Sequence, residues 1–322
     1  MMFALRGLVV SLSTSFILYS FLSLAVCALW RGLSRYSHRI ASAGMYSDAL
    51  FALRCLPLVV ALGLTLALAL PSFLLLEPRS GKESMGIVAL GLCLCGIAVM
   101  LAGGWNAAAV LRQTSRSVAR WSAHSRVITS RALPDSQSFP LRQTSLPAPP
   151  LTAAGILHPE VWLSPAAESV LTERELLSAL RHELIHVQRR DNLRKLLLRF
   201  LAFPGMAALE SAWCESAEMA ADDAAVRTPS EALDLATAMI KLSRLASPPP
   251  HAELTTALVH SPAELLKARV ERLISWSDRP QPSQHSLFSR YAAVAFALCF
   301  VLGAANHGLL VWVHTATELL VR

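Results

Sequence analysis

Residues 86–111 read GIVALGLCLCGIAVMLAGGWNAAAVL and contain no charged side chain. A helix of about 20 apolar residues is long enough to cross the roughly 30 Å hydrocarbon core of a bilayer. The stretch also lies at a boundary, because apolar runs dominate the chain before it and a polar region rich in Arg, Ser and Pro follows it. We therefore predict that residues 86–111 form a membrane-spanning helix that leads into a domain outside the bilayer.

Three further runs have the same uncharged character, at residues 7–30, 55–76 and 291–313. Over the whole chain 54% of the residues are hydrophobic and only 16% are charged, and the mean hydropathy is +0.46. Soluble domains usually carry about 25% charged residues. These values exclude an ordinary soluble protein and predict four transmembrane helices. The first run is longer than the apolar part of a signal peptide and lacks a good cleavage site, so we expect it to be retained.

Positive charges indicate how the spans are oriented. Residues 31–54 hold four Arg and one Asp, residues 77–85 are balanced, and Arg is frequent directly after the third run. Because Arg and Lys collect on the cytoplasmic side of membranes, we predict a multi-pass protein of the cell membrane with residues 31–54 and the polar region in the cytoplasm. Residues 77–85 and both termini are then outside. This bias also explains the net charge of +7, so no direct nucleic-acid binding is expected.

The chain accordingly divides into three parts. We predict a three-helix transmembrane region at 1–112, a cytoplasmic domain at 113–287, and a fourth transmembrane helix with a short tail at 288–322. Five of the six cysteines lie in or beside apolar runs, where cysteine acts as a small hydrophobic residue. No disulfide framework is therefore expected.

The polar region predicts a mainly helical domain with a little sheet. Residues 113–150 look irregular, whereas 151–157 and 161–163 are expected to form short strands, one of them at a sheet edge because prolines flank them. Thr172 and Glu175 form a capping box that opens an apolar helix stripe. Further helices are predicted at 192–203 behind an Asp191 cap, at about 207–226, at 231–246 and from 263 to about 276.

Residues 181–191 read RHELIHVQRRD, with His182 and His186 four positions apart. Residues i and i+4 share one face of a helix, so the two imidazoles can bind one zinc ion. Glu183 can then act as general base toward a zinc-bound water, whose pKa the metal lowers to about 7. The pattern is short, and its context must decide between a metal site and two surface histidines.

A catalytic zinc usually has three protein ligands and one open position. Glu218 and Asp222 lie four residues apart on a predicted helix that is otherwise apolar. Glu218 can supply the third ligand, and Asp222 can orient a ligand histidine through a hydrogen bond to its ring. Glu215 is the main competitor for the ligand role, and Glu210 is a weaker one. The alternative is a solvated acidic helix face.

The order of these features resembles the gluzincin metallopeptidases: a strand, a helix with HELIH followed by RRD, and a second helix with Glu218 and Asp222. With three spans before the domain and one after it, the chain is similar to the BlaR/MecR-type membrane metallopeptidases. The resemblance implies a gluzincin-like α+β metallopeptidase domain, inserted between the third and fourth spans and facing the cytoplasm. It also implies one Zn²⁺ per chain bound by His182, His186 and Glu218, with Glu183 as the catalytic residue.

In that family the protease serves signalling, through cleavage of itself and of a cytoplasmic repressor. The resemblance therefore implies a protein substrate such as a transcriptional repressor, and it allows a homodimer in the bilayer. The β-lactam-sensing members carry an external sensor domain after the last span. This chain ends at Arg322, nine residues after the fourth run. We therefore expect no penicillin-binding domain and no β-lactam receptor role.

Three alternatives compete with a signalling endopeptidase. A zinc-binding transmembrane signalling or scaffold protein without turnover would be favoured by loss of Glu183, which is present. A quality-control protease for membrane proteins would use the same residues. An intramembrane protease would need the motif inside an apolar run, but charged residues such as Arg181 and Asp191 flank it.

A few other polar residues are weaker candidates. His307 and His314 lie seven residues apart near the fourth run and share a helical face, so they could sense a ligand or a metal, although helix packing is the simpler interpretation. Cys214 precedes Glu218 by four residues and is expected to be a packed thiol. His158 is treated as an ordinary loop histidine. The sequence does not assign an oxyanion-stabilising residue.

Overall fold

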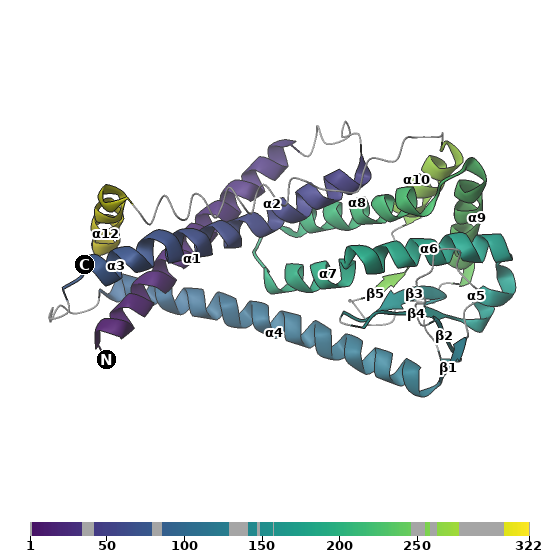
Figure 1. Ribbon diagram of the computed structural model, residues 1–322, viewed down its shortest axis with the longest axis horizontal. Helices are drawn as coiled ribbons and strands as arrows, with labels where there is room; N and C mark the ends of the chain where they lie inside the picture. Colours follow the sequence, from purple (N-terminus) through teal and green to yellow (C-terminus); the bar gives the residue numbers. More distant parts are fainter. Residues whose placement is uncertain are drawn as a thin grey trace.

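The structure is a computed structural model that describes residues 2–33, 42–78, 86–128, 141–146, 149–156, 158–245, 255–257, 263–276 and 306–321. The described part is mainly helical and contains one five-stranded sheet, which confirms the predicted mainly α composition. Figure 1 shows an elongated molecule with both chain ends at one extremity and the sheet at the other.

Three helical segments are long and apolar enough to cross a membrane, and they contain the first three uncharged runs. The second segment includes a π-helical turn just before Pro71. Proline has no N–H to donate and its ring crowds the carbonyl four residues earlier, so the wider turn keeps the helix continuous. The segments are α1 (Met2–Leu33), then α2 (Ala43–Leu64) with η2 (Thr65–Ala69) and α3 (Leu70–Leu76), and finally α4 (Ile87–Ala123).

The fourth uncharged run, 291–313, lies largely outside the described residues. Only its end is seen, where α12 (His307–Val321) begins. The count of four spans, and the insertion of the polar domain between the third and the fourth, therefore stay predictions.

Helix α4 is longer than its apolar run. It continues to Ala123 and passes through the predicted domain boundary at 112 without a break, and residues 125–128 and 141–144 then form strands. The expectation of irregular structure over 113–150 is therefore wrong for these segments. Buried residues at helical spacing (Val110, Thr114, Ser117 and Trp121) explain the continuation, because they give this polar stretch one face that packs.

The sheet has the strand order β1-β2-β4-β3-β5, with only the β2–β4 pair parallel. The two predicted strands appear as β3 and β4, but neither is an edge, because β3 pairs with β4 and β5 while β4 pairs with β2 and β3. The edge expectation is therefore wrong. The strands are β1 (Ser125–Ile128), β2 (Leu141–Thr144), β3 (Leu151–Ala154), β4 (Glu160–Leu163) and β5 (Thr255–Ala257).

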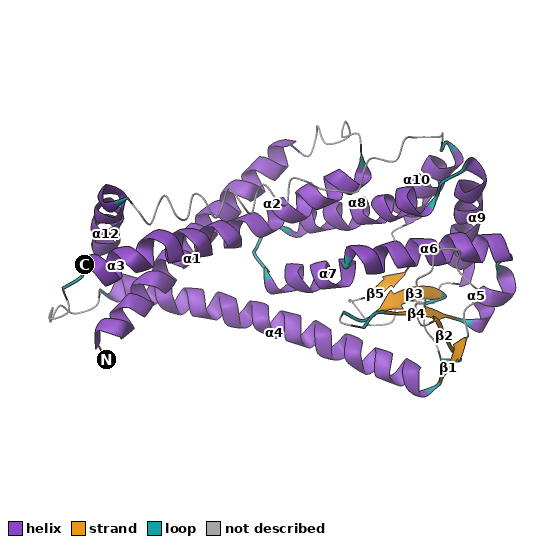
Figure 2. Cartoon of the chain, in the orientation of Figure 1, coloured by secondary structure: helices purple, strands orange, loops and turns teal. Residues whose placement is uncertain are grey.

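Helix α6 lies between the sheet on one side and helix α8 on the other, and it also packs against α9 (Figure 2). Its start is the predicted capping box, in which Thr172 Oγ1 accepts from the Glu175 N–H at 3.4 Å and Glu175 Oε2 accepts from the Thr172 N–H at 2.8 Å. The helices of this region are α5 (Pro165–Val170), α6 (Glu173–Arg189), α7 (Asp191–Phe200), α8 (Ala207–Ala225), α9 (Pro229–Leu245) and α10 (Ala263–Ile274).

The two largest hydrophobic cores among the described residues hold these parts together. One joins the sheet to α6 and α9 and includes Val161, Ala179 and Met239. The other joins α7 and α8 to the membrane helices α1 and α2, with Trp213 packed near Leu50. The helix that carries Glu218 is therefore packed directly against a predicted transmembrane helix.

Candidate metal centre

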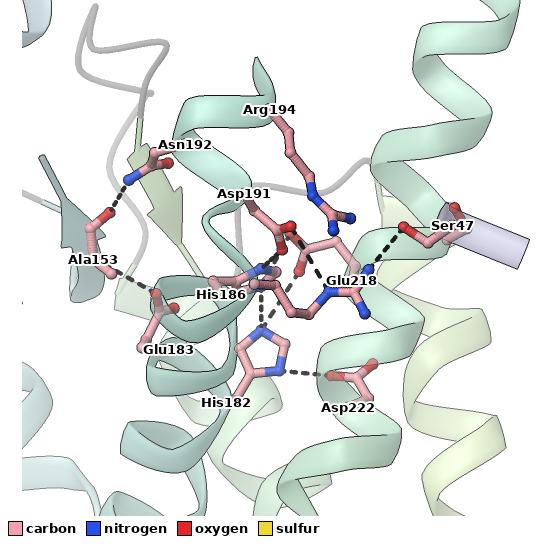
Figure 3. A network of polar contacts seen from close by, with 12 residues as sticks. Ser47, Ala153, His182, Glu183, His186, Asp191, Asn192, Arg194, Glu218 and Asp222 are labelled. Carbon is pink, nitrogen blue, oxygen red and sulfur yellow. Dashed lines mark hydrogen bonds and ion pairs between the residues drawn. The ribbon is translucent and has the colours of Figure 1, made fainter. Parts of the chain in front are cut away.

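Three of the predicted site residues come together between α6 and α8. His182 and His186 lie on one face of α6 and are almost fully buried, and their Nε2 atoms are 3.1 Å apart. Glu218 reaches across from α8, with one carboxylate oxygen 3.6 Å from His182 Nε2 and the other 3.6 Å from His186 Nε2. Figure 3 shows the three side chains pointing toward one another. We call His182, His186 and Glu218 the α6 cluster.

The spacing of the α6 cluster fits a tetrahedral metal ion. Ligand atoms about 2.0–2.2 Å from a zinc ion are separated from one another by roughly 3.3–3.5 Å. The three separations in the structure, 3.1, 3.6 and 3.6 Å, lie close to this range. Two imidazoles and one carboxylate are also a donor set that zinc accepts. The arrangement therefore fits a metal ion of the zinc type held by the two imidazoles and the Glu218 carboxylate.

Each histidine is held through its other ring nitrogen by a buried carboxylate. His182 Nδ1 lies 3.0 Å from Asp222 Oδ1, and His186 Nδ1 donates to Asp191 Oδ2 at 2.7 Å. Such contacts fix the ring orientation and the tautomer, so that Nε2 is presented to a metal. The structure thus places Asp222 where the sequence predicted it. The prediction for Asp191 was wrong, because the N-cap of α7 is Arg190 and Asp191 contacts His186 instead.

Arg269 on α10 is a site residue that the sequence analysis missed. Its side chain is buried, and Nε and Nη2 each donate to Asp222 at 2.7 Å, while Nη1 lies 3.0 Å from Glu218 Oε2. One guanidinium therefore balances two carboxylates of the site, the buried Asp222 and the partly buried Glu218. No short-range pattern signals this role, since Arg269 lies 47 residues after Asp222.

These charges alter the protonation of the site. Burial lowers the pKa of His186, but the carboxylates of Glu218 and Asp191 more than offset this effect and raise it to about 10. Burial would raise the pKa of Glu218 and of Asp222, yet Arg269 and the histidines lower the first well below its usual value and the second to about 2. Both carboxylates are therefore ionised, as a metal ligand and a histidine partner need to be.

Glu183 lies on the sheet side of α6. Its carboxylate is fully buried, and Oε2 accepts a hydrogen bond from the Ala153 N–H on β3 at 3.0 Å. The side-chain amide of Asn192 on α7 also binds this strand and its end. It donates hydrogen bonds to the carbonyl oxygens of Ala153 at 3.3 Å and Gly155 at 3.1 Å. The strand therefore positions the glutamate that follows the first histidine, as Figure 3 shows.

Glu215 and Glu210, the other candidates for the third metal ligand, are not part of the α6 cluster. Glu215 is exposed, and Glu210 forms an ion pair with Arg54 of α2, with Nε and Oε1 3.2 Å apart. Among the carboxylates of α8 in the described part of the chain, Glu218 is the one grouped with both histidines. Cys214, which was expected to be packed, is exposed. His158 is exposed as well.

Comparison with protein-family models gives a match that covers the metal centre. The sequence model of the family described as BlaR1 peptidase M56 matches residues 78–273, more than half of the chain. That segment includes the sheet, α6, α8 and most of α10, and so it holds every residue of the centre described above. No curated protein matches the chain.

Proposed function

Since the chain belongs to the BlaR1 peptidase M56 family, we propose that it is a membrane-bound zinc endopeptidase with the α6 cluster as its metal site. The observation that carries the proposal is the convergence of His182, His186 and Glu218 within ligand distance, with one carboxylate behind each histidine. Family membership supports a membrane metallopeptidase. The identity of the metal as Zn²⁺, one per chain, is our proposal.

The roles of the side chains follow from their contacts. Zinc bound there would polarise the scissile carbonyl and lower the pKa of water to about 7. Asp191 and Asp222 keep both imidazoles aimed at the metal, and Arg269 keeps the acids ionised. Glu183 takes up the proton of the attacking water and returns it to the leaving amine. Its position beside His182, against β3, supports this role.

We propose that the peptidase domain faces the cytoplasm and that both termini lie outside. Arg residues gather near the ends of the spans that approach the sheet, including Arg31 and Arg54 and those at positions 112, 116 and 120. The chain ends lie at the opposite extremity (Figure 1). The boundaries at 112 and 287 stay predictions, and α4 crosses the first of them as one helix.

We further propose that the activity is regulated proteolysis of a protein substrate, such as a repressor or the chain itself. The support is a polar connection between α2 and the α6 cluster. Asp48 of α2 accepts from Arg194 at 2.7 Å and from Arg189 at 3.4 Å, and Arg189 lies 3.7 Å from Asp191, the partner of His186. A movement of α2 in the membrane would therefore reach a histidine of the site.

Arg54 adds a second connection from α2. It donates to the Leu201 carbonyl, which Tyr19 of α1 also contacts at 3.1 Å, and it pairs with Glu210 of α8. These contacts favour a peptidase controlled through its membrane helices over an unregulated one. In this proposal the chain itself binds no nucleic acid and can assemble as a homodimer.

Purified full-length protein in detergent tests the proposal. We expect one zinc per chain and cleavage of the chain itself or of a co-expressed candidate repressor, with both lost in Glu218→Gln. Glu215→Gln is the matched control, because it removes an exposed carboxylate from the same helix. Equal zinc and equal cleavage in the Glu218→Gln protein would overturn the assignment. Stoichiometric zinc with no cleavage of either substrate would instead favour a zinc-binding scaffold.

A further inference from the structure

A second group of one imidazole and two carboxylates lies near the chain ends, far from the α6 cluster. Glu77 directly follows α3, and His314 and Glu318 lie one turn apart on α12. His314 Nε2 is 3.8 Å from Glu77 Oε2 and 3.5 Å from Glu318 Oε1. One ligand atom from each residue lies within 4.8 Å of the others. We call these three residues the α12 cluster, and Figure 1 shows α12 beside α3.

We propose that the α12 cluster binds a divalent cation of the zinc type, taken up at the end of the membrane region opposite to the peptidase domain. Imidazole and carboxylate together suit zinc and similar first-row metals. Neighbouring ligand atoms of a tetrahedral ion are roughly 3.3–3.5 Å apart. The separation of 3.5 Å from Nε2 lies at the upper end of this range, and that of 3.8 Å lies slightly above it. Small side-chain adjustments would therefore complete the site.

The charge of the cluster also favours a cation. Two carboxylates around one imidazole leave a net negative charge even when the imidazole is protonated. All three side chains have some solvent access, with exposed fractions of 15% for His314, 17% for Glu77 and 43% for Glu318. An ion can therefore reach the cluster from water and keep a water ligand.

Helix packing alone explains His314 poorly. Its Nδ1 atom is buried and has no hydrogen-bond partner among the described residues, which costs free energy. An apolar residue would pack there without this cost. His307, seven residues earlier on the same helix, is exposed and lies outside the cluster, so the two histidines do not form one site.

The position of the cluster suggests what binding would do. An ion held by Glu77, His314 and Glu318 would join the end of α3 to α12. Helix α3 continues from α2. Two residues of α2 contact the peptidase domain, because Asp48 pairs with Arg194 and Arg54 pairs with Glu210. The cation would thus act on the helix that contacts the α6 cluster. This regulatory consequence rests on the proposed peptidase function, whereas the binding itself does not.

Metal binding by the full-length protein in detergent tests the inference without any cleavage assay. We expect the wild-type chain to bind two equivalents of Zn²⁺, or of Co²⁺ followed by its absorption bands. The His314→Gln protein should bind one equivalent, while His307→Gln, the matched control on the same helix, should bind two. In the His186→Ala protein, the equivalent at the α12 cluster should remain.

Glu77→Gln provides a second variant, because it changes a residue at a helix end and leaves α12 intact. It should weaken the second equivalent at least about tenfold, as expected for the loss of a charged ligand. Two equivalents with unchanged affinity in both the His314→Gln and Glu77→Gln proteins would overturn the inference. So would a wild-type chain that binds a single equivalent which is lost in the His186→Ala protein. Absence of cleavage with two bound ions would count against the proposed function alone.

Discussion

The α6 cluster and the α12 cluster place their ligands in the same way but are surrounded differently. His182 and His186 lie four residues apart on one helix, as do His314 and Glu318, and a carboxylate from another element completes each group. In the α6 cluster both histidines are almost fully buried, with exposed fractions of 0% and 2%. In the α12 cluster His314 is 15% exposed and Glu318 is 43% exposed.

The support behind the ligands differs as well. Asp222 and Asp191 hold the two histidines of the α6 cluster, and Arg269 balances the acids. The Nδ1 atom of His314 is buried and has no hydrogen-bond partner among the described residues. The comparison teaches that helical spacing brings ligand atoms together, while burial and supporting contacts decide how firmly they are held. We therefore expect permanent metal binding at the α6 cluster and reversible binding at the α12 cluster.

The largest expected effect comes from removing a ligand of the α6 cluster. His186→Ala should abolish both zinc retention after dialysis and peptide cleavage, because a two-ligand site with an unpaired Asp191 binds zinc poorly. Elemental analysis of the purified protein measures the zinc. His314→Gln is the comparison, and it should leave the dialysis-resistant zinc in place. A His186→Ala protein with full zinc after dialysis would break the distinction between the two clusters.

Arg269 should have the next largest effect. Replacing it with Met leaves the buried Asp222 and the partly buried Glu218 without their counter-charge. Breaking the buried pair with Asp222 costs about 3–5 kcal/mol. Thermal unfolding of the metal-free protein should show the loss. Added zinc should restore part of it, because the metal supplies positive charge. Lys267→Met, at an exposed position on the same helix, is the control and should change little.

Substitution of Asp191 or Asp222, the carboxylates beside the two histidines, should have the third-largest effect. Asp191→Asn and Asp222→Asn are each expected to weaken zinc binding about 10–100-fold, because the ring orientation is less firmly fixed. Competition with a chelator measures the affinity. Asp234→Asn on α9, away from the site, should bind zinc like the wild type. If Asp191→Asn also binds like the wild type, the contact with His186 does not support the ligand.

The capping box should give the smallest effect. Thr172→Ala removes the cap of α6 and should cost about 1 kcal/mol of stability. Burial raises the pKa of the capping-box Glu175, but hydrogen bonds from Lys241 and Thr172 lower it below 4.5 overall. The stabilisation from Glu175 is therefore present above about pH 4.5 and is lost as the pH falls toward its folded-state value.

Thermal unfolding of the wild-type and Thr172→Ala proteins at pH 7 and at pH 4 measures how much the capping box stabilises the fold at each pH. Thr237→Ala, an exposed threonine within α9, is the control and should be neutral or slightly stabilising, because alanine favours helices. Equal unfolding temperatures for the Thr172→Ala protein and the wild type would show that packing, and not the cap, defines the start of α6.

The sequence predicted the parts of the fold that depend on local pattern. The first three long apolar helices, the strands predicted at 151–157 and 161–163, and the capping box at Thr172 need only neighbouring residues. All are present, with the strands at 151–154 and 160–163. The pairing of His182 with His186, and of Glu218 with Asp222, follows from helical spacing alone. The convergence of the two pairs fits the expected ligand set.

What the sequence did not predict depends on distant contacts. Strands β1, β2 and β5 are short and form only through pairing. Pairing with β2 and β5 leaves neither β4 nor β3 at the edge that was expected for one of them. Arg269 reaches the site through the packing of α10 against α8. Asp191 has the sequence position of a helix cap, but its carboxylate contacts His186 across the turn. These strand pairings and side-chain contacts depend on tertiary structure and cannot be predicted from neighbouring residues.

Glu183→Gln gives the most direct test of the peptidase assignment. It keeps the size of the side chain and all three residues of the α6 cluster, and it removes the group that accepts the proton. We predict that the purified protein retains one zinc at the α6 cluster and cleaves itself or a co-expressed repressor about 10²–10⁴-fold more slowly than the wild type. Cleavage at the wild-type rate with zinc bound would contradict the account.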